Sequence, residues 1–324
     1  MRLLITEFVT GGGMANHPIP EGLKQEGRLM LQSVLSDCKK IDGIEIMATV
    51  DTRFLQDIEI DNKIEINKVD DYLPTILELA EQNDLVWVIA PESDEILKTI
   101  IEKLADSDVE LINCNAESIH IASDKLMCTK LLQENNLPAV ENFSSEYAAQ
   151  YAKKAVIKNR FGVGSEGMKI CQSGKEALSE VGDDLENWLI QPFVIGENLS
   201  MSILCSNGKA EVLSCNKQMF TEGNEPKLKM CQANAISVTH KHKELANQIA
   251  KIVHGMKAYV GVDYIDCDGD IKIVDINPRL TTSYVGLSKV INMNPAQLCI
   301  DATLNSVLPT DLQRNSKIAE VIIG

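Results

Sequence analysis

The segment 261–279 contains two carboxylates and one amide whose spacing suits a metal ion. It reads GVDYIDCDGDIKIVDINPR, and its central Asp-Gly pair predicts a tight turn between two antiparallel strands. That turn would place Asp263 beside Asp275, with Asn277 on the same face as Asp275 because side chains alternate along a strand. Carboxylate and amide oxygens are ligands that Mg²⁺ or Mn²⁺ accepts. We interpret these three residues as a metal site that bridges nucleotide phosphates; the alternative is a solvated acidic hairpin.

Arg279 follows this group and could act on a phosphoryl group. It lies two residues after Asn277 and faces the same way if the chain stays extended. A guanidinium there could hold a transferring phosphoryl group or an acyl-phosphate oxygen. A calcium-binding loop is excluded for Asp266, Asp268 and Asp270, because the glycine is misplaced and no glutamate closes the loop.

A glycine-rich segment upstream is suited to phosphate binding. Residues 156–167 read VIKNRFGVGSEG. The residues of interest are Gly162, Gly164, Ser165 and Gly167. A dinucleotide-binding dehydrogenase needs a helix after such glycines, whereas residues 168–171 predict a strand. The glycines would therefore form a flap whose backbone N–H groups meet phosphate oxygens, with Lys158 reaching the same phosphates. A glycine-rich hairpin with a surface lysine is an equal alternative.

A third segment could bind the nucleoside. Residues 191–200 read QPFVIGENLS and follow an apolar strand. An adenine edge could pair with the hinge residues Gln191, Phe193 and Val194. Glu197 could accept hydrogen bonds from ribose hydroxyls, and Lys217 is a further candidate for the triphosphate or an acyl phosphate. The alternatives are an ordinary turn with an exposed acid and an exposed lysine.

The elements that must position these groups change character along the chain. Strands and helices alternate over the first 115 residues, which predicts a doubly wound parallel sheet. The strands expected there are 2–9, 43–50, 85–90 and 109–112, and the helices are 21–38, 73–82 and 94–105. A helix is then expected to begin at the N-cap Ser123 and to run to Glu134. The later part reads as α+β with antiparallel strands at 155–158, 168–171, 188–194, 199–206, 210–216, 259–265 and 270–276, and helices at 241–257 and 294–305.

In their order these segments resemble the ATP-grasp carboxylate–amine ligases, over about residues 115–290. The order comprises a helix lysine (Lys125), a strand lysine (Lys158), the flap, the hinge with its acid, an aspartate and an acid-x-Asn-Pro-Arg motif. The final acid is usually Glu in that family and is Asp275 here. The resemblance implies an ATP-grasp fold, α/β plus α+β, that follows an N-terminal domain with a doubly wound parallel sheet. The domains expected are 1–115, an ATP-grasp N-subdomain at 116–190 and a C-subdomain at 191–324.

The resemblance also implies a reaction. ATP would activate a carboxylate as an acyl phosphate, and an amine would displace phosphate to give an amide and ADP. Lys125 and Lys158 would bind the phosphates, and Arg279 and Lys158 would act on the reacting groups. Within the family, the resemblance points to ligases of methanofuran-type cofactor synthesis that join the glutamate γ-carboxyl to tyramine. Another acid and amine pair, or a non-catalytic nucleotide-binding regulator, stays an alternative.

The acceptor side of the site is less defined. An amine is mostly protonated at neutral pH, so a carboxylate should bind the ammonium and help to remove its proton. Glu7, beside the glycine turn 11–13, is one candidate, with a structural acid as the equal alternative. The glycine turn and the loop 281–284 are expected to border the acceptor pocket.

Composition limits the partners. The 324 residues carry 31 Lys and Arg against 47 Asp and Glu, a formal net charge of −16, which disfavours nucleic acid. The N-terminus lacks a signal-peptide pattern, and no apolar run is long enough to span a membrane. The nine cysteines show no CxxC spacing and suggest buried thiols in a reducing compartment. We expect a cytoplasmic protein with small acid and amine substrates and no membrane partner, which can form a homodimer.

Overall fold

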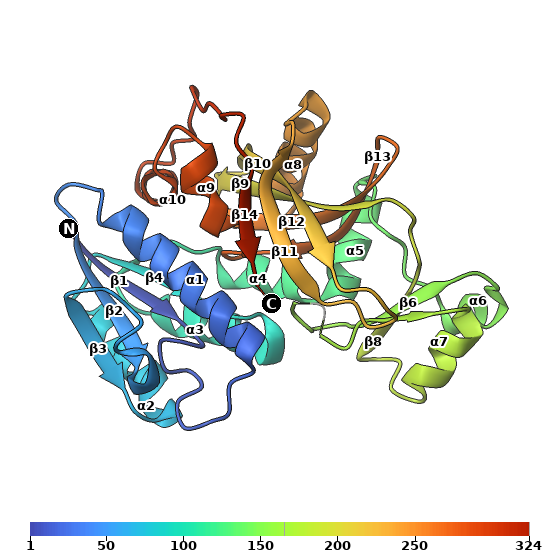
Figure 1. Ribbon diagram of the computed structural model, residues 1–324, viewed down its shortest axis with the longest axis horizontal. Coiled ribbons are helices and arrows are strands. Elements are labelled where there is room, and N and C mark those ends of the chain that lie inside the picture. Colours follow the sequence, from blue (N-terminus) through green and yellow to red (C-terminus); the bar gives the residue numbers. More distant parts are fainter. Residues whose placement is uncertain (165, 324) are drawn as a thin grey trace.

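A computed structural model describes residues 1–164 and 166–323 and contains three sheets (Figure 1). The first sheet is parallel, with the strand order β3-β2-β1-β4-β5. Its strands are β1 (Arg2–Glu7), β2 (Glu45–Asp51), β3 (Asn62–Ile66), β4 (Leu85–Ile89) and β5 (Glu110–Leu111). The predicted doubly wound parallel sheet is confirmed.

Helices cover both faces of this sheet. Leu3 and Ile5 of β1 pack in the same buried cluster as Leu31 of α1 (Glu21–Cys38). Leu4 faces the other way, toward Ile76 and Leu97 on the opposite side. That side is covered by α2 (Val69–Ala80) and α3 (Ile96–Leu104). Both faces of the central strands are therefore apolar, as a parallel sheet between two helical layers requires.

The later part of the chain forms two antiparallel sheets. The larger has the order β13-β12-β9-β10-β11-β14, and the smaller has the order β7-β6-β8. The larger comprises β9 (Glu197–Ser206), β10 (Lys209–Phe220), β11 (Leu228–Ile236), β12 (Ala258–Cys267), β13 (Asp270–Asn277) and β14 (Ala319–Ile322). The smaller comprises β6 (Ala155–Asn159), β7 (Lys169–Cys171) and β8 (Trp188–Pro192). Figure 1 shows the larger sheet between the N-terminal parallel sheet and the smaller sheet.

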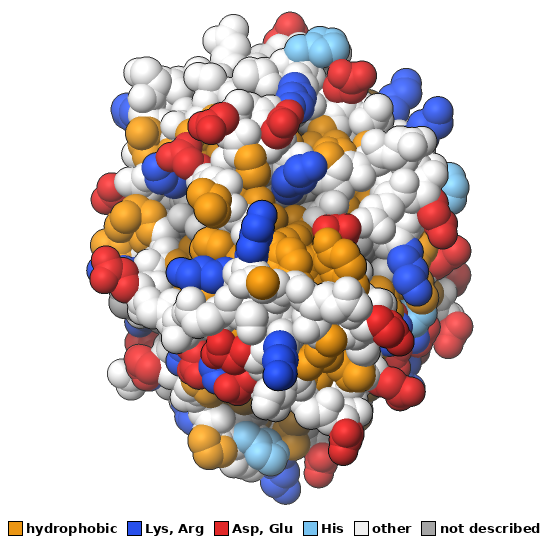
Figure 2. Space-filling view, turned by 90° about the vertical axis from the view of Figure 1, so that its right-hand side faces the viewer, with side chains coloured by type: hydrophobic (Ala, Val, Ile, Leu, Met, Phe, Trp, Pro, Cys, Tyr) orange, Lys and Arg blue, Asp and Glu red, His pale blue; other side chains and the backbone are white. Residues whose placement is uncertain are grey.

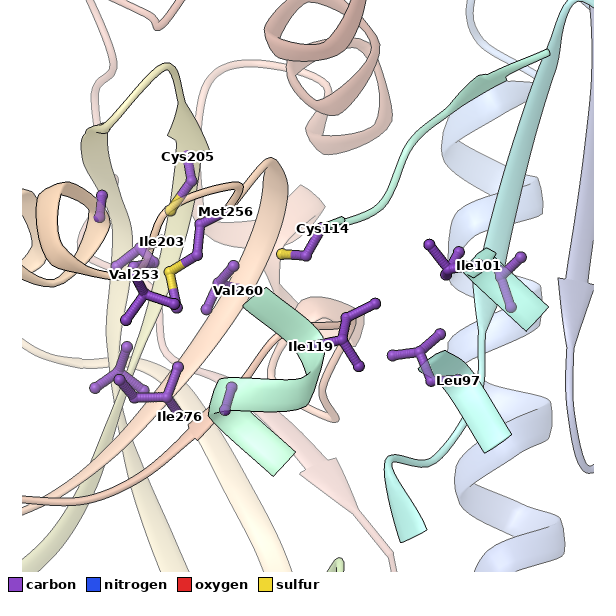
Figure 3. Packing of buried hydrophobic residues seen from close by; sticks show 14 of the residues in the cluster. Leu97, Ile101, Cys114, Ile119, Ile203, Cys205, Val253, Met256, Val260 and Ile276 are labelled. Atoms are coloured by element: carbon purple, nitrogen blue, oxygen red, sulfur yellow. The ribbon is translucent and has the colours of Figure 1, made fainter. Parts of the chain in front are cut away.

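The remaining helices join these sheets. They are α4 (Ala116–Ser123), α5 (Lys125–Glu134), α6 (Ser145–Gln150), α7 (Gly174–Val181), α8 (His240–Ile252), α9 (Tyr284–Val290) and α10 (Pro295–Leu304). Short 3₁₀ turns cover Thr52–Phe54 and Ser93–Glu95. In Figure 3, Ile119 of α4 lies between Leu97 of α3 and Val260 of β12. All three belong to one buried cluster, so the N-terminal unit and the larger sheet share a core.

Several elements were not predicted. The missed strands are β3, β11 and β14, and the missed helices are α4, α6, α7 and α9. The expected N-cap Ser123 is wrong: it ends α4, and Asp124 caps α5 by accepting from the N–H groups of Leu126 and Met127. The missed elements are mostly short or rich in polar residues, so periodicity is weak in them. No helix among residues 1–164 and 166–323 is long and apolar enough to cross a membrane.

Candidate active site

A cavity of about 580 Å³ gathers most of the residues singled out in the sequence. Its lining comes from the small sheet and flap, from the segment after β8, from the larger sheet and from α1. The predicted residues that line it are Lys125, Lys158, Gly162, Gly164, Gln191, Phe193, Val194, Asp263, Asp275, Asn277 and Arg279. Three others, Gly167, Glu197 and Lys217, do not line it, and the predicted Ser165 lies outside the described residues.

The predicted acidic hairpin forms between β12 and β13. Asp268 and Gly269 make the turn with positive φ angles of 56° and 96°, and Asp263 pairs directly with Asp275. The Asp263 carboxylate accepts hydrogen bonds from the amides of Gln218, at 2.9 Å, and Asn277, at 3.0 Å. The turn and the pairing are thus confirmed, while Gln218 is an additional contact that the sequence did not indicate.

The electrostatics of this hairpin favour a bound cation. Burial and the neighbouring Asp275 charge raise the pKa of Asp263 to about 6. A divalent cation would remove the repulsion between the two carboxylates, and the oxygen donors are those that Mg²⁺ prefers. Within the described residues no group of three or more His, Cys, Asp or Glu side chains could hold a metal. Two carboxylates and one amide fit an ion whose other ligands are phosphates and water.

Two lysines lie beside this pair of aspartates. Lys158 Nζ donates to the Val274 carbonyl at 3.1 Å, and burial lowers its pKa to about 8 despite the nearby charge of Asp275. Lys125 Nζ lies 3.2 Å from Asp275 and donates to the Gly162 carbonyl at 2.6 Å. The two ammonium groups therefore sit between the flap and the acidic hairpin, where nucleotide phosphates would meet both.

The flap joins β6 to β7, as predicted. Gly164 and Gly167 have positive φ angles of 59° and 68°, which glycine adopts without strain. Arg160, at the start of the flap, makes a paired ion contact with Asp124, with atoms as close as 2.5 Å. Arg160 thereby ties the flap to the start of α5, which carries Lys125. The sequence did not indicate this contact.

The hinge residues line the cavity, but Glu197 does not. Glu197 forms an ion pair with Lys217 at 2.7 Å, and the two side chains are 56% and 41% exposed. Gln191 is buried and donates to Asn142 at 2.7 Å. The lobe that contains the small sheet faces the viewer in Figure 2, where hydrophobic side chains gather among charged ones. Exposed hydrophobic side chains in the hinge include Phe193 and Ile195.

Arg279 is anchored from the N-terminal unit. Its Nε donates to Glu92 Oε2 at 2.7 Å, and the two side chains are only 13% and 5% exposed. The nearby carboxylates outweigh burial and raise the pKa of Arg279. Glu92 follows β4, 187 residues away in the sequence. The guanidinium thus faces the cavity from a fixed position.

The acceptor side differs from the expectation. The idea that Glu7 meets the amine is wrong: Glu7 is buried, does not line the cavity and accepts from the N–H and hydroxyl of Thr10 at 2.7 and 2.6 Å. The glycine turn 11–13 is also buried away from the cavity. In the loop 281–284, all residues except Tyr284 line the cavity. Glu26, which the sequence analysis did not single out, reaches the cavity from α1.

Two segments of the chain match known family models. Residues 122–283 match the family model described as an ATP-grasp domain. Residues 44–119 match the model described as a pre ATP-grasp 3 domain. The two matches therefore cover the chain from β2 to the loop after β13.

Relatives and solved structures extend this similarity. The chain is 30% identical to a tyramine–L-glutamate ligase of Methanocaldococcus fervens, over 88% of this chain and 89% of that protein. It is 27% identical to the enzyme of the same name from Methanocaldococcus jannaschii, over 94% and 90%. A crystal structure of an ATP-grasp superfamily protein from Archaeoglobus fulgidus superposes with a TM-score of 0.71 at 23% identity, covering 97% of this chain and 91% of that one.

The geometry and the comparisons agree on the fold. A glycine flap, two lysines, a hinge and an acidic hairpin surround one cavity. The matching family model spans half of the chain, and the relatives cover most of it. The chain belongs to the ATP-grasp family.

Proposed function

We propose that this protein is an ATP-dependent ligase that joins the γ-carboxyl of glutamate to the amine of tyramine. The products would be the γ-glutamyl amide, ADP and phosphate. The observation that carries the ligase assignment is the single cavity that contains Lys125, Lys158, the acidic hairpin and Arg279. The choice of substrates follows the name of the relatives that share 27–30% identity over most of this chain.

The lysines and the arginine of the cavity have separate roles in the proposed reaction. A carboxylate does not react with an amine directly because its oxygen is a poor leaving group, so it must first accept the γ-phosphoryl of ATP. Lys125 and Lys158 would hold the phosphates and balance their charge during transfer. Arg279 would stabilise the acyl phosphate and the oxyanion that forms when the amine attacks. No side chain needs to be modified covalently.

A divalent cation, Mg²⁺ or Mn²⁺, completes the proposed site. Asp263, Asp275 and Asn277 would hold it, and it would neutralise charge on the phosphates. The shorter Asp275, in place of the usual Glu, would still supply a carboxylate oxygen to the ion. We also propose a cytoplasmic location, supported by nine cysteines that are all free. A homodimer stays a prediction, which light scattering would test.

The test is a substrate panel. The purified protein is incubated with ATP, Mg²⁺ and pairs drawn from a set of acids that includes glutamate and a set of amines that includes tyramine, and ADP and the amide are measured by mass spectrometry. We expect a γ-glutamyl amide of tyramine and one ADP per amide. If another acid and amine pair reacts instead, the substrate assignment is wrong but the ligase assignment holds. If no pair gives an amide, the ligase assignment is wrong.

A further inference from the structure

We propose that Glu26 binds the primary ammonium group of a substrate. The proposal rests on the proposed function, because it assigns the cation that this cavity must recognise. Glu26 lies on α1 of the N-terminal unit and reaches the cavity beside the loop 281–284. It lines the same cavity as Lys125 and Lys158, the two lysines proposed to hold the phosphates.

The backbone of α1 brings this carboxylate to the cavity. A Cβ added to Gly27 would lie 2.6 Å from Glu7 Oε2, so only glycine allows α1 to approach the end of β1 so closely. The hydroxyl of Thr282 then donates to Glu26 Oε1 across the boundary between the N-terminal unit and the C-terminal part. The close approach of α1 to Glu7 therefore helps to position the helix, and Glu26, the residue next to Gly27, lines the cavity.

Glu26 differs from the two aspartates of the cavity in its charged and polar partners. Asp275 lies 3.2 Å from Lys125, and Asp263 accepts from two amides. Over the described residues, Glu26 has no Lys, Arg or His within the 4.0 Å of an ion pair. Arg279, a cation that lines the same cavity, is already paired with Glu92. The Glu26 carboxylate is half-buried and has no cationic partner among the described side chains. A ligand could supply that cation.

A primary ammonium group meets this need and occurs on both proposed organic substrates. It can donate hydrogen bonds to the carboxylate and also carries the opposite charge. One source is the acceptor amine, tyramine. The other source is the α-ammonium of glutamate, which stays free when the γ-carboxyl is activated. The chemistry that Glu26 recognises is the same in both cases.

The experiment compares Glu26→Gln with Glu21→Gln. Glutamine at position 26 keeps the size of the side chain and its contact with Thr282, and it removes only the charge. Glu21 lies on the same helix with a side chain that is 81% exposed and does not line the cavity, so it is the matched control. Tyramine and glutamate are each titrated calorimetrically into the protein with Mg²⁺ and ADP, and KM values are measured in parallel. The analogues 4-ethylphenol and glutarate lack the ammonium group.

We expect Glu26→Gln to weaken binding of one of the two substrates by about tenfold or more, as loss of a charge-assisted hydrogen bond implies. Weaker binding of tyramine would mean that Glu26 binds the ammonium group of the acceptor amine. Weaker binding of glutamate would mean that it binds the α-ammonium group of glutamate. The corresponding analogue should bind the variant and the wild type equally. Glu26→Asp should recover part of the affinity, and Glu21→Gln should change none of these values.

Three results would overturn the proposal. They are unchanged affinity in Glu26→Gln, an equal loss for the uncharged analogue, and failure of the wild type to bind either ammonium compound. The assay of amide formation tests the proposed function independently of the role of Glu26. Binding that depends on Glu26 without any amide product would contradict the ligase assignment alone.

Discussion

Lys158 carries its positive charge at a buried position between the flap and the acidic hairpin. Burial lowers its pKa to about 8, while Asp275 partly opposes that shift. A neutral amine could still donate a hydrogen bond, but it would not balance the charge of a triphosphate. The charged form of Lys158 is therefore costly in the free protein and stabilised when phosphates bind.

This pKa predicts proton uptake on nucleotide binding. At pH 8 about half of the Lys158 side chains are neutral in the free protein, and bound phosphates would restore the charged form. ADP binding should therefore take up as much as about 0.5 proton at pH 8 and less at pH 7. Calorimetry in buffers of different ionisation enthalpy measures this number. Lys158→Arg is the control, since its guanidinium stays charged and should take up none. Equal uptake by both proteins would contradict the assignment.

Asp275 offers a second test on a single residue. Asp275→Asn removes one carboxylate of the proposed metal site, and we expect ATP turnover to fall by about a hundredfold or more, since even outer-shell changes cost 10–100-fold. The fold should persist because the side chain lies at the cavity rather than in the core. Asp270→Asn, on the same strand with a side chain that is 87% exposed, is the matched control. Circular dichroism checks the fold, and normal turnover in Asp275→Asn would exclude this residue from the reaction.

Among the elements, the flap and the hinge line the part of the cavity where we propose that the nucleotide binds. The flap contains glycines with positive φ angles and is tied to α5 through Arg160 and Asp124. Phosphates that accept hydrogen bonds from its backbone should hold it closed. Lys125 Nζ contacts both the flap carbonyl of Gly162 and Asp275, so this side chain joins the flap to the acidic hairpin.

We expect hydrogen exchange in the flap to slow when nucleotide binds. The amides of 160–164 and 166–168 should be protected by ATP with Mg²⁺, while the hairpin turn at Asp268 and Gly269, far from the phosphates, should not change. Exchange measured by mass spectrometry with and without ATP tests this. Equal exchange at the flap in both states would show that it does not hold the phosphates.

The contact between Arg279 and Glu92 links β4 to the segment after β13. Glu92→Gln leaves the buried guanidinium without its counter-charge, and we expect the free energy of unfolding to fall by about 3 kcal/mol. Urea denaturation measures this change. Glu95→Gln is the control: this side chain is 63% exposed and pairs with Lys98, so its loss should lower the free energy of unfolding far less. Similar stability of the two variants would mean that the buried pair does not stabilise the fold.

The sequence predicted the parts of the site that depend on local structure and missed those that depend on packing between distant elements. The pairing of Asp263 with Asp275 followed from a local Asp-Gly turn, and the flap followed from glycines before a strand. Glu92 and Glu26 could not be found in this way. They contact Arg279 and Thr282 across 187 and 256 residues, and those contacts depend on how the N-terminal unit packs against the larger sheet. Edge strand β14 was missed because its four residues carry little periodicity.

At the scale of the whole molecule, two units complete one site. The larger sheet supplies the acidic hairpin, and the N-terminal unit supplies Glu26, which lines the same cavity, and Glu92, which pairs with Arg279. The shared core around α4 holds the two units together (Figure 3). The net charge of −16 makes the local cations of the cavity, rather than the overall surface, responsible for attracting a nucleotide.

In the proposed reaction, ATP activates a carboxylate as an acyl phosphate before the amine attacks. The most direct test uses glutamate labelled with oxygen-18 in its γ-carboxylate, together with tyramine, ATP and Mg²⁺. Mass spectrometry then follows the label into the products. We expect ADP, the γ-glutamyl amide with one labelled oxygen, and inorganic phosphate that has gained the other. Label in AMP, or amide formed with unlabelled phosphate, would contradict the account.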